Sequence, residues 1–454
     1  MTPPTAGTGA VALDRRTIDR RTVALALPAL GALAAEPLYV LVDTVIVGHL
    51  GTVPLGGLAV ASSALTSVAW LFAFLNSVTA TRVAQARGAD SPARIGDAVR
   101  HALVLAGTLA SIVVAALIAL APAIARIYGP ASDVQAAAVT YLRISAVGIG
   151  ALYVSFVGIG WLNGMGRTRQ TLTVVAVANV ANLALEVVLV YGFHAGLAGS
   201  AWGTVIAQWG QGAMLMTLAW RGGVLGSFRS VSPRELRRML ADGLRLGTRT
   251  ATIVGVFAVS VALAARLGTR QLAAHQIGDK LFGLLALCLD ALAVAAQVMV
   301  GEAIGAGDVE RARLVTAHLV RRSVLIGVAL GATIAALSSV LPLPFSHDTD
   351  VRSSATGVVA LLGLLLVPGA VAFLYDGVCL GLGAFTFLRA QALSALAAMV
   401  PFLVALALDH QLGLPFLWLG LTVWMCARAI IQHVWFRSDR WLLSVPVRRN
   451  DSWR

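Results

Sequence analysis

Apolar runs of about 20 residues recur along the whole chain, and each is long enough to cross a bilayer as an α-helix. This feature constrains the fold more than any other. The mean hydropathy of the 454 residues is +0.84 and 12% of them are charged, whereas a soluble domain carries about 25%. The hydropathy pattern predicts twelve membrane-spanning helices with short connections. Their approximate ranges are 23–48, 55–80, 98–122, 134–160, 170–192, 197–220, 243–265, 272–299, 315–341, 353–381, 389–409 and 414–436.

The basic residues are distributed unevenly about these helices. The formal net charge is +13, and most of the 34 Lys and Arg residues fall in the tails and in the loops after even-numbered spans. The opposite side carries Arg126, Arg266, Arg270, Lys280 and Arg352. Only Arg143 and Arg428 are expected within spans. The positive-inside rule therefore predicts a multi-pass inner (plasma) membrane protein with both termini in the cytoplasm, and no nucleic-acid partner.

The two halves of the chain repeat at an offset of 217 residues. The segment ARGADSPARIGDAVRHAL at 86–103 aligns without a gap on AIGAGDVERARLVTAHLV at 303–320, which pairs Gly88 with Gly305. Six spans therefore repeat as six more in the same orientation. This pattern is typical of parallel repeats related by an axis along the membrane normal.

The predicted fold class is an all-α polytopic membrane protein, with twelve transmembrane helices arranged as two pseudo-symmetric six-helix bundles. The predicted units are a disordered cytoplasmic tail (1–20), an N-terminal six-helix lobe (21–220), a basic cytoplasmic linker (221–240), a C-terminal six-helix lobe (241–436) and a cytoplasmic tail (437–454). Two such lobes enclose a central cavity, and rocking of one against the other alternates the access to it. We expect a monomer in the lipid bilayer.

The first span contains two carboxylates, Glu36 and Asp43, in the segment EPLYVLVDTVIVGHLG. A charge at the centre of a membrane helix costs at least about 2.5–3.5 kcal/mol, so an ionisable residue there is a candidate functional group. The two acids are seven residues apart and share one helix face. Pro28 and Pro37 favour a kink that frees carbonyls for protein or water partners. We predict that this face lines a wet cavity and that both acids couple an ion.

The fifth span repeats this chemistry in the segment VANVANLALEVVLVYG, which carries Asn179, Asn182 and Glu186. Spacings of three and four residues place the three side chains on one stripe of a helix. Two amides and a carboxyl can share a proton network or supply oxygen ligands to a small hard cation. Polar contacts between helices are the alternative use of such residues in membranes.

The C-terminal half offers secondary candidates. Asp290 and Gln297 lie seven residues apart in the eighth span, and Asp376 lies deep in the tenth. The chain contains no GxxxxGK[ST] segment, and its single lysine, Lys280, follows no Gly-rich loop, so a P-loop site for ATP is excluded. We expect no cofactor, no catalytic residue and no enzymatic activity, and a proton or sodium gradient as the energy source.

Burial disfavours the ionised form of a carboxyl, so a buried acid can load a proton on one side of the membrane and release it on the other. The same group attracts an organic cation when it is ionised. Each ligand shifts the populations of the two lobe orientations, because it binds one orientation more tightly than the other. Competition between a proton and a small organic molecule for one carboxylate is therefore the simplest physical form of antiport.

Three segments carry a resemblance to a known family: PLYVLVDTVIVGHLG, AAHQI…LDALAVAAQ and YDGVCLGLGA. Over residues 20–436 the chain resembles the multidrug and toxic compound extrusion (MATE) family, in the branch of the DNA-damage-inducible F proteins. The resemblance implies efflux of organic, usually cationic or amphipathic compounds driven by protons or sodium. It also implies that Asp43 is the coupling acid, and that Asn182, Glu186 and Thr204 match the family's fifth- and sixth-span pattern. Sodium, if used, would bind at these four residues.

Two departures from the family pattern affect these expectations. Position 186 is Glu where the family has Asp, and the longer side chain can change the choice of ion. The seventh span, TRTATIVGVFAVSVALAARLG, lacks the acid found in another branch. We therefore predict that coupling resides in the N-terminal lobe.

Other functions remain open on the sequence alone. A flippase of lipid-linked precursors in the wider superfamily would be expected to carry a cluster of arginines in its cavity. A membrane-embedded enzyme would need a convergent His/Asp or Ser/His set near one interface. A channel is the fourth option, and the two-lobe repeat with its buried acids favours stepwise exchange over it.

Overall fold

The computed structural model describes residues 15–129, 131–226 and 231–444, and every regular element in these ranges is a helix. The N-terminal half consists of α1 (Arg15–Gly48), α2 (Thr52–Phe72), α3 (Phe74–Gly88), α4 (Pro92–Ile127), α5 (Ser132–Ala146), α6 (Ile149–Gly164), α7 (Thr168–Val187), the π-helix η1 (Val188–Gly192) and α8 (Gly196–Arg221). The C-terminal half consists of α9 (Pro233–Arg266), α10 (Thr269–Gly305), α11 (Val309–Ala336), α12 (Thr349–Leu382), α13 (Phe385–Leu408), η3 (His410–Leu412), α14 (Gly413–Arg437) and η4 (Arg440–Ser444).

Each predicted span falls on one helix or on one consecutive pair of helices. Among the described residues, ten helices are long and apolar enough to cross a membrane, or eleven if α5 and α6, which bend by 49°, form one broken span. Helix α8 occupies the sixth predicted span but is not among these eleven. Helix α1 is continuous through both Pro28 and Pro37.

The predicted tails and linker are more helical than expected. Helix α1 begins at Arg15, inside the predicted disordered tail, and α9 begins at Pro233, inside the predicted linker. Proline is favoured in the first turn of a helix because its missing N–H would be unpaired there. The rest of the predicted N-terminal tail (1–14), residues 227–230 of the linker and the end of the chain (445–454) lie outside the described residues.

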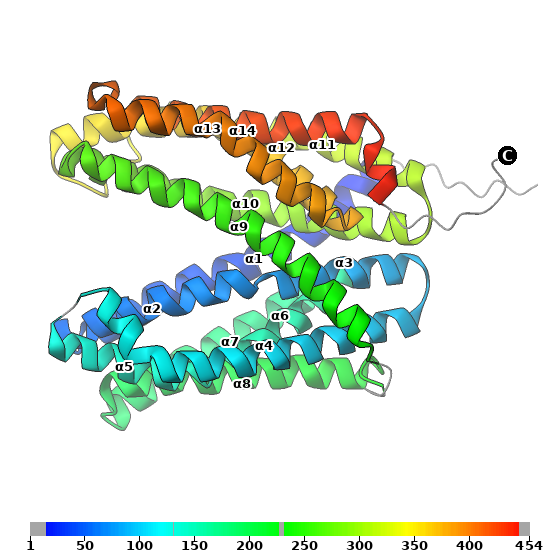
Figure 1. Cartoon of the computed structure of the whole chain (residues 1–454), viewed down its shortest axis with the longest axis horizontal. Coiled ribbons are helices and arrows are strands. Elements are labelled where there is room, and N and C mark those ends of the chain that lie inside the picture. The colour runs from blue at the N-terminus through cyan, green and yellow to red at the C-terminus, as the bar shows by residue number, and fades with distance from the viewer. Residues whose placement is uncertain (1–14, 130, 227–230, 445–454) are drawn as a thin grey trace, which may run out of the picture.

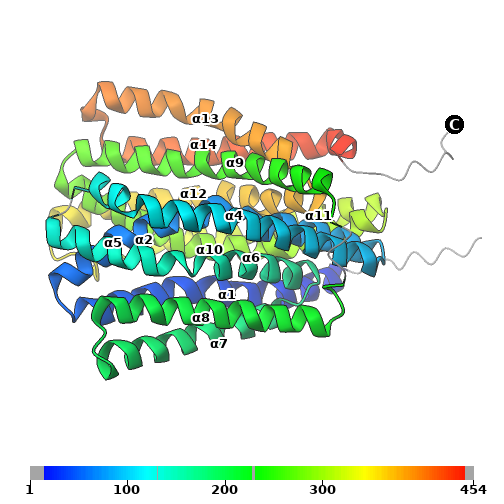
Figure 2. The same ribbon diagram turned by 60° about the horizontal axis from the view of Figure 1, so that its bottom comes forward.

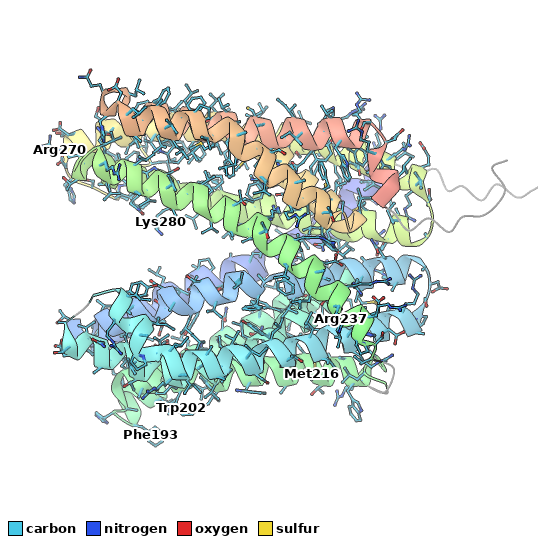
Figure 3. All side chains as sticks on the ribbon, in the orientation of Figure 1. Phe193, Trp202, Met216, Arg237, Arg270 and Lys280 are labelled. Atoms are coloured by element: carbon cyan, nitrogen blue, oxygen red, sulfur yellow. The ribbon has the colours of Figure 1, made fainter. Side chains whose placement is uncertain are left out.

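The helices form two lobes that run along one common axis (Figures 1 and 2). Figure 1 shows α2 to α8 in one lobe and α10 to α14 in the other, with α9 crossing from the second lobe toward the first. Helix α1 begins and η4 ends at the same end of the molecule, here called the terminal end. At the opposite end, the exposed side chains of Phe193 and Trp202 point out of the first lobe (Figure 3), as aromatic residues do at membrane–water interfaces.

The repeat is visible in the helix packing. Gly160 of α6 lies against the backbone of α3, where an added Cβ would be 2.5 Å from the carbonyl oxygen of Asn76. Gly377 of α12 lies in the same way against α10, with a Cβ 2.2 Å from the carbonyl oxygen of Ala293. Both members of the second contact are 217 residues after those of the first. The two lobes therefore repeat one another in close backbone contacts.

The contact between the lobes has the same symmetry. A Cβ on Gly88 of α3 would lie 2.0 Å from the carbonyl oxygen of Glu302 on α10, and a Cβ on Gly305 would lie 1.9 Å from the carbonyl oxygen of Gln85 on α3. These pairs are exchanged by the offset of 217 residues. Helices α3 and α10 thus meet across the pseudo-two-fold axis, and only glycine permits so close an approach.

Polar side chains reinforce this contact near the terminal end. The Gln297 side chain donates to the Ser77 carbonyl and the Thr81 hydroxyl, both at 3.0 Å, and Gln85 donates to the Gly381 carbonyl at 2.9 Å. Ion pairs join the lobes nearby: Glu302 with Arg21 and Arg87, Asp19 with His318 and Arg322, and Arg82 with Glu235 and Asp242. The terminal end is therefore the closed end of this structure.

We predict that Gly305→Ala destabilises the protein by about 1–3 kcal/mol, because the methyl group would overlap a backbone carbonyl that cannot move independently. The midpoint of thermal unfolding of the purified protein in detergent measures this loss. Gly255→Ala on α9 is the matched control, since no heavy atom lies within 4 Å of its Cβ position. Equal unfolding midpoints for the two variants would contradict the proposed packing role of Gly305.

Candidate functional site

Two buried acids meet inside the N-terminal lobe. Asp43 of α1 is 6% exposed, and its Oδ1 accepts a hydrogen bond of 2.8 Å from the Ser200 hydroxyl of α8. Glu186 of α7 is 0% exposed, and its side chain lies near those of Asp43 and Ser200 without a hydrogen bond to either. Neighbouring carboxylates repel one another, and a proton or a cation between them relieves the repulsion. The pair is therefore chemically suited to hold a proton or a small cation.

Hydroxyl groups surround the two acids. The Tyr39 hydroxyl of α1 and the Thr204 hydroxyl of α8 are 2.8 Å apart, within hydrogen-bond distance. The buried Tyr141 of α5 interacts with both Ser200 and Thr204. Side chains of α1, α5, α7 and α8 thus form one polar cluster of Tyr39, Asp43, Tyr141, Glu186, Ser200 and Thr204. We call these residues, together with the buried Asn182 one turn before Glu186, the N-lobe acid cluster.

The local sequence explains how α8 comes this close to Glu186. Gly203 of α8 packs directly on α7, and a Cβ there would be 3.2 Å from the Cα and the backbone nitrogen of Glu186. Ser200 and Thr204 flank this glycine, so the helix contact presents both hydroxyls to the acids. Just after Glu186, α7 changes to the π-helix η1, a widened turn that is frequent at functional sites.

Three oxygens of the acid cluster are buried without a hydrogen-bond partner in the described part of the chain: Glu186 Oε1, Glu186 Oε2 and Asn182 Oδ1. Buried polar atoms in folded proteins are nearly always hydrogen-bonded. An unsatisfied buried carboxyl is stabilised by a bound proton or by a cation that uses its oxygens as ligands. The cluster is therefore chemically suited to binding and releasing a positive charge.

The structure brings some of the predicted residues together and separates others. Asp43, Glu186 and Thr204 meet in the acid cluster, and Asn182 is buried one turn before Glu186 on the same helix. Asn179 is half-buried one turn further away. Glu36 is exposed, and no hydrogen bond or ion pair of the described residues joins it to the cluster. The ion-coupling role expected for Glu36 therefore stays a prediction.

Sequence reasoning missed three hydroxyl-bearing members, Tyr39, Tyr141 and Ser200. Two of them had a usable signal. Tyr39 is four residues before Asp43, and Ser200 is four residues before Thr204, so each shares a helix face with a predicted residue. Tyr141 lies on α5, and no spacing relates it to the acids.

In the C-terminal lobe, the buried acid is paired with basic side chains. The buried Asp376 of α12 pairs with Arg249 of α9 and with Arg428 of α14, whose Nη2 lies 2.7 Å from Oδ2. The Gln432 amide donates to Oδ1 at 2.7 Å. Arg428 also lies over the Trp424 ring, 5.2 Å from its centroid. Both carboxylate oxygens of Asp376 are therefore occupied by protein donors.

Two other polar residues of this lobe, Gln297 and Arg249, make contacts that the sequence did not predict. Gln297 is used for the contact between the lobes described above. Arg249, which was not among the arginines expected within spans, is 18% exposed within α9 and contacts Asp376. Asp290 is half-buried and lies within electrostatic reach of Asp376, Arg249 and Arg428, and the ion pairs of the two arginines are with Asp376.

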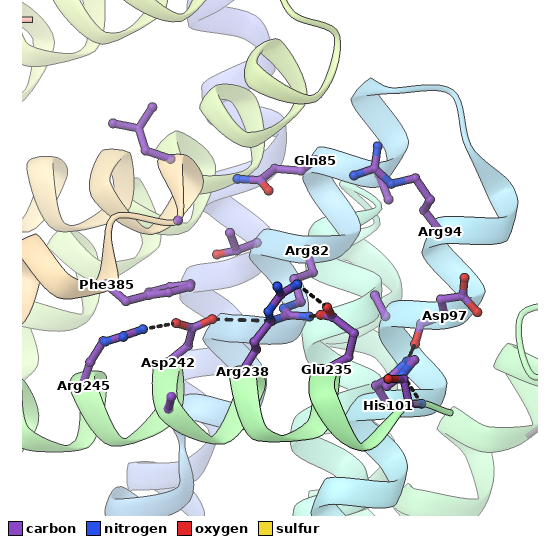
Figure 4. Close-up of a pocket in the computed structure, with 17 residues that line it drawn as sticks. Arg82, Gln85, Arg94, Asp97, His101, Glu235, Arg238, Asp242, Arg245 and Phe385 are labelled. Carbon is purple, nitrogen blue, oxygen red and sulfur yellow. Dashed lines mark hydrogen bonds and ion pairs between the residues drawn. The ribbon is translucent and has the colours of Figure 1, made fainter. Parts of the chain in front are cut away.

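A cavity lies at the closed terminal end, between α3, α4 and α9 (Figure 4). Leu382, Gly383 and Phe385 of the C-terminal lobe also line it. Its volume is about 820 Å³ and its walls carry both signs of charge, including Arg82, Glu235 and Asp242. Arg82 bridges the two acids across it, at 3.2 and 3.5 Å. The acid cluster is not part of this cavity.

Comparisons with known proteins agree with this architecture. The family model described as MatE matches residues 28–188 and 248–407, one match in each lobe. The chain is 30% identical over 434 residues to DETOXIFICATION 44, chloroplastic, of Arabidopsis thaliana, covering 91% of this chain and 81% of that protein. It is 29% identical over 445 residues to DNA damage-inducible protein F of Escherichia coli (strain K12), covering 93% of each.

Solved structures show the same fold. One described as a MATE protein in the bent conformation gives a TM-score of 0.84 at 19% identity, covering 95% of this chain and 97% of that chain. Another, described as the outward-facing conformation of a multidrug resistance MATE family transporter, gives a TM-score of 0.83 at 19% identity, with coverages of 94% and 96%. The resemblance inferred from three sequence segments is thus confirmed: the chain belongs to the MatE family of membrane transporters, which are not enzymes.

Proposed function

We propose that the protein is a secondary active antiporter that exports organic, cationic or amphipathic compounds in exchange for protons or sodium. The observation that carries this proposal is the pair of buried carboxyls, Asp43 and Glu186, with unsatisfied oxygens in one lobe of a two-lobe transporter. A bound proton or sodium ion would lower the negative charge of the pair by one, and an organic cation would compete for the same carboxylates. Loss of either ligand would change the relative energy of the two lobe orientations.

The pattern of contacts between the lobes supports alternating access. Polar bonds and ion pairs join the lobes near the terminal end. If the termini are cytoplasmic, as the charge asymmetry predicts, this structure is closed toward the cytoplasm. Transport then requires that these contacts break while the opposite end closes. Family members bind small organic substrates and couple to ion gradients, and we extend the same cycle to this chain.

A flippase function is less well supported. A lipid-linked diphosphate would need uncompensated arginines in the cavity, and the two arginines buried in the C-terminal lobe, Arg249 and Arg428, are paired with Asp376. Both arginines are therefore already engaged by a carboxylate of the protein.

We predict that Asp43→Asn abolishes the release of protons from everted vesicles when a fluorescent organic cation is added. The amide cannot exchange a proton, so the cation has nothing to compete with. Asp133→Asn, an exposed acid at the start of α5, is the matched control and should retain full exchange. Normal exchange by the Asp43 variant at an equal protein level would remove this residue from the mechanism.

We predict that Glu186→Gln weakens coupling or shifts it between the two ions, because the variant keeps the size of the side chain and loses one titratable carboxyl. Transport in vesicles with the proton and sodium gradients varied independently measures the ion dependence. The wild-type protein in the same assay decides which ion drives transport. An ion dependence identical to that of the wild type would show that Glu186 has only a structural role.

In contrast, Asp376→Asn should destabilise the fold by about 3–5 kcal/mol, because it leaves two buried guanidinium groups without their counter-charge. Thermal unfolding in detergent measures the loss, with Asp279→Asn, a half-buried acid of α10, as the control. Adding Arg249→Gln should recover part of the stability by removing one unpaired charge. A wild-type unfolding midpoint for Asp376→Asn would refute the structural assignment.

A further inference from the structure

A second, smaller cavity lies at the terminal end of the N-terminal lobe, where α1, the last turn of α3 and the turn between α6 and α7 meet. Its volume is about 370 Å³. Four arginines line it: Arg21, Arg87, Arg167 and Arg169. None of the described lining residues is a carboxylate. The proposed coupling mechanism uses none of these arginines.

The turn between α6 and α7 positions one of these arginines. Arg87 Nη1 donates to the Met165 carbonyl at 2.5 Å. Gly166 has a φ of +67°, and a Cβ at this position would lie 2.7 Å from the same Nη1 atom. The backbone conformation therefore favours glycine here, and its lack of a side chain lets the guanidinium pack directly on the turn. Helix α7 begins two residues later without a side-chain cap, so its N-terminal N–H groups add positive potential.

The positive charge of the cavity is only partly neutralised. Glu302 reaches it from α10 of the other lobe and pairs with Arg21 and Arg87, the second pair at 2.6 Å. Arg167 and Arg169 are exposed, and no ion pair of the described residues includes them. Four guanidinium groups against one carboxylate leave an excess of three positive charges. A ligand for this cavity is therefore an anion with several acceptor oxygens, such as a phosphate ester.

The surface beside the cavity is apolar. Helix α1 exposes Val23 and Leu27, at 61% and 65%, beside the cavity-lining Ala24, which lies one turn before Leu27. Helix α7, which packs against α1, exposes Val177 and Val180 two to three turns further into the membrane. A basic pocket at the end of apolar helices lies at the depth of lipid head groups, and basic pockets between helices on the cytoplasmic side bind anionic head groups.

We infer that this cavity binds the phosphate of an anionic phospholipid, with its acyl chains along the exposed faces of α1 and α7. The apolar faces are the reason for choosing a lipid over a soluble phosphate, since they offer a soluble ion no contact. The lipid phosphate and the Glu302 carboxylate share two arginines, Arg21 and Arg87, and so compete for them. If the lobes part at the terminal end, as in the proposed transport cycle, Glu302 leaves with α10 and the four arginines remain with the lipid.

The test is native mass spectrometry of the full-length protein in detergent, titrated with phosphatidylglycerol or with phosphatidylcholine. We expect preferential retention of phosphatidylglycerol, and a loss of apparent affinity on the order of tenfold in the double variant Arg167→Gln/Arg169→Gln. The double variant Arg221→Gln/Arg321→Gln is the control: it removes two exposed arginines outside the cavity and should bind as the wild type. Equal affinities for both lipids, or equal losses in the two double variants, would overturn the inference.

Glu302→Gln tests the competition in the opposite direction. Removing the carboxylate should tighten phosphatidylglycerol binding by on the order of tenfold, a gain that an unfolded variant could not show. Weaker or unchanged binding would contradict the shared use of Arg21 and Arg87. Inorganic phosphate at the lipid's concentration should leave the complex intact, and displacement by it would assign the site to a soluble anion. Vesicle transport is a separate readout, so failure of the lipid site leaves the proposed antiport untouched.

Discussion

The free-energy cost of an uncompensated charge away from water determines how this protein uses its ionisable residues. In the C-terminal lobe, both carboxylate oxygens of Asp376 are bound by two arginines and a glutamine. In the N-terminal lobe, Asp43 and Glu186 have hydroxyl neighbours and no basic partner among the described residues. The same cost that holds the first group together makes the second group a candidate site for a bound proton or cation. One physical rule thus separates a structural acid from candidate coupling acids.

The closed end of the molecule follows the same rule. Glu302 is only 10% exposed at its side chain, and it is stabilised there because two arginines of the other lobe surround it. Its backbone carbonyl also packs directly on Gly88 in the close contact between α3 and α10. Steric fit and charge pairing therefore act at one residue. Opening this end would separate Glu302 from Arg21 and Arg87, and a replacement anion, which we assign to a lipid, would lower the cost of that separation.

Much of the architecture could be predicted because it depends on local or repeated patterns. Apolar runs indicated the spans, and the 217-residue offset indicated the paired lobes, whose glycine contacts repeat in the same register. Asp43 and Glu186 were identified because an acid inside an apolar run is exceptional. Glu36 was equally exceptional, yet it lies exposed and apart from the acid cluster. Helical spacing gives the face of a residue and does not give what covers that face.

The sequence by itself determined the membrane-spanning helices, their duplication and the identity of two buried acids. Only the tertiary structure decided which charges are paired. Ser200 meets Asp43 across 157 residues of chain, and Arg249 meets Asp376 across 127. Such partners are selected by the packing of one helix against another, as at Gly203, and no spacing along a single helix encodes them. For this reason composition indicated a transporter, while the division between a compensated and an uncompensated lobe required the fold.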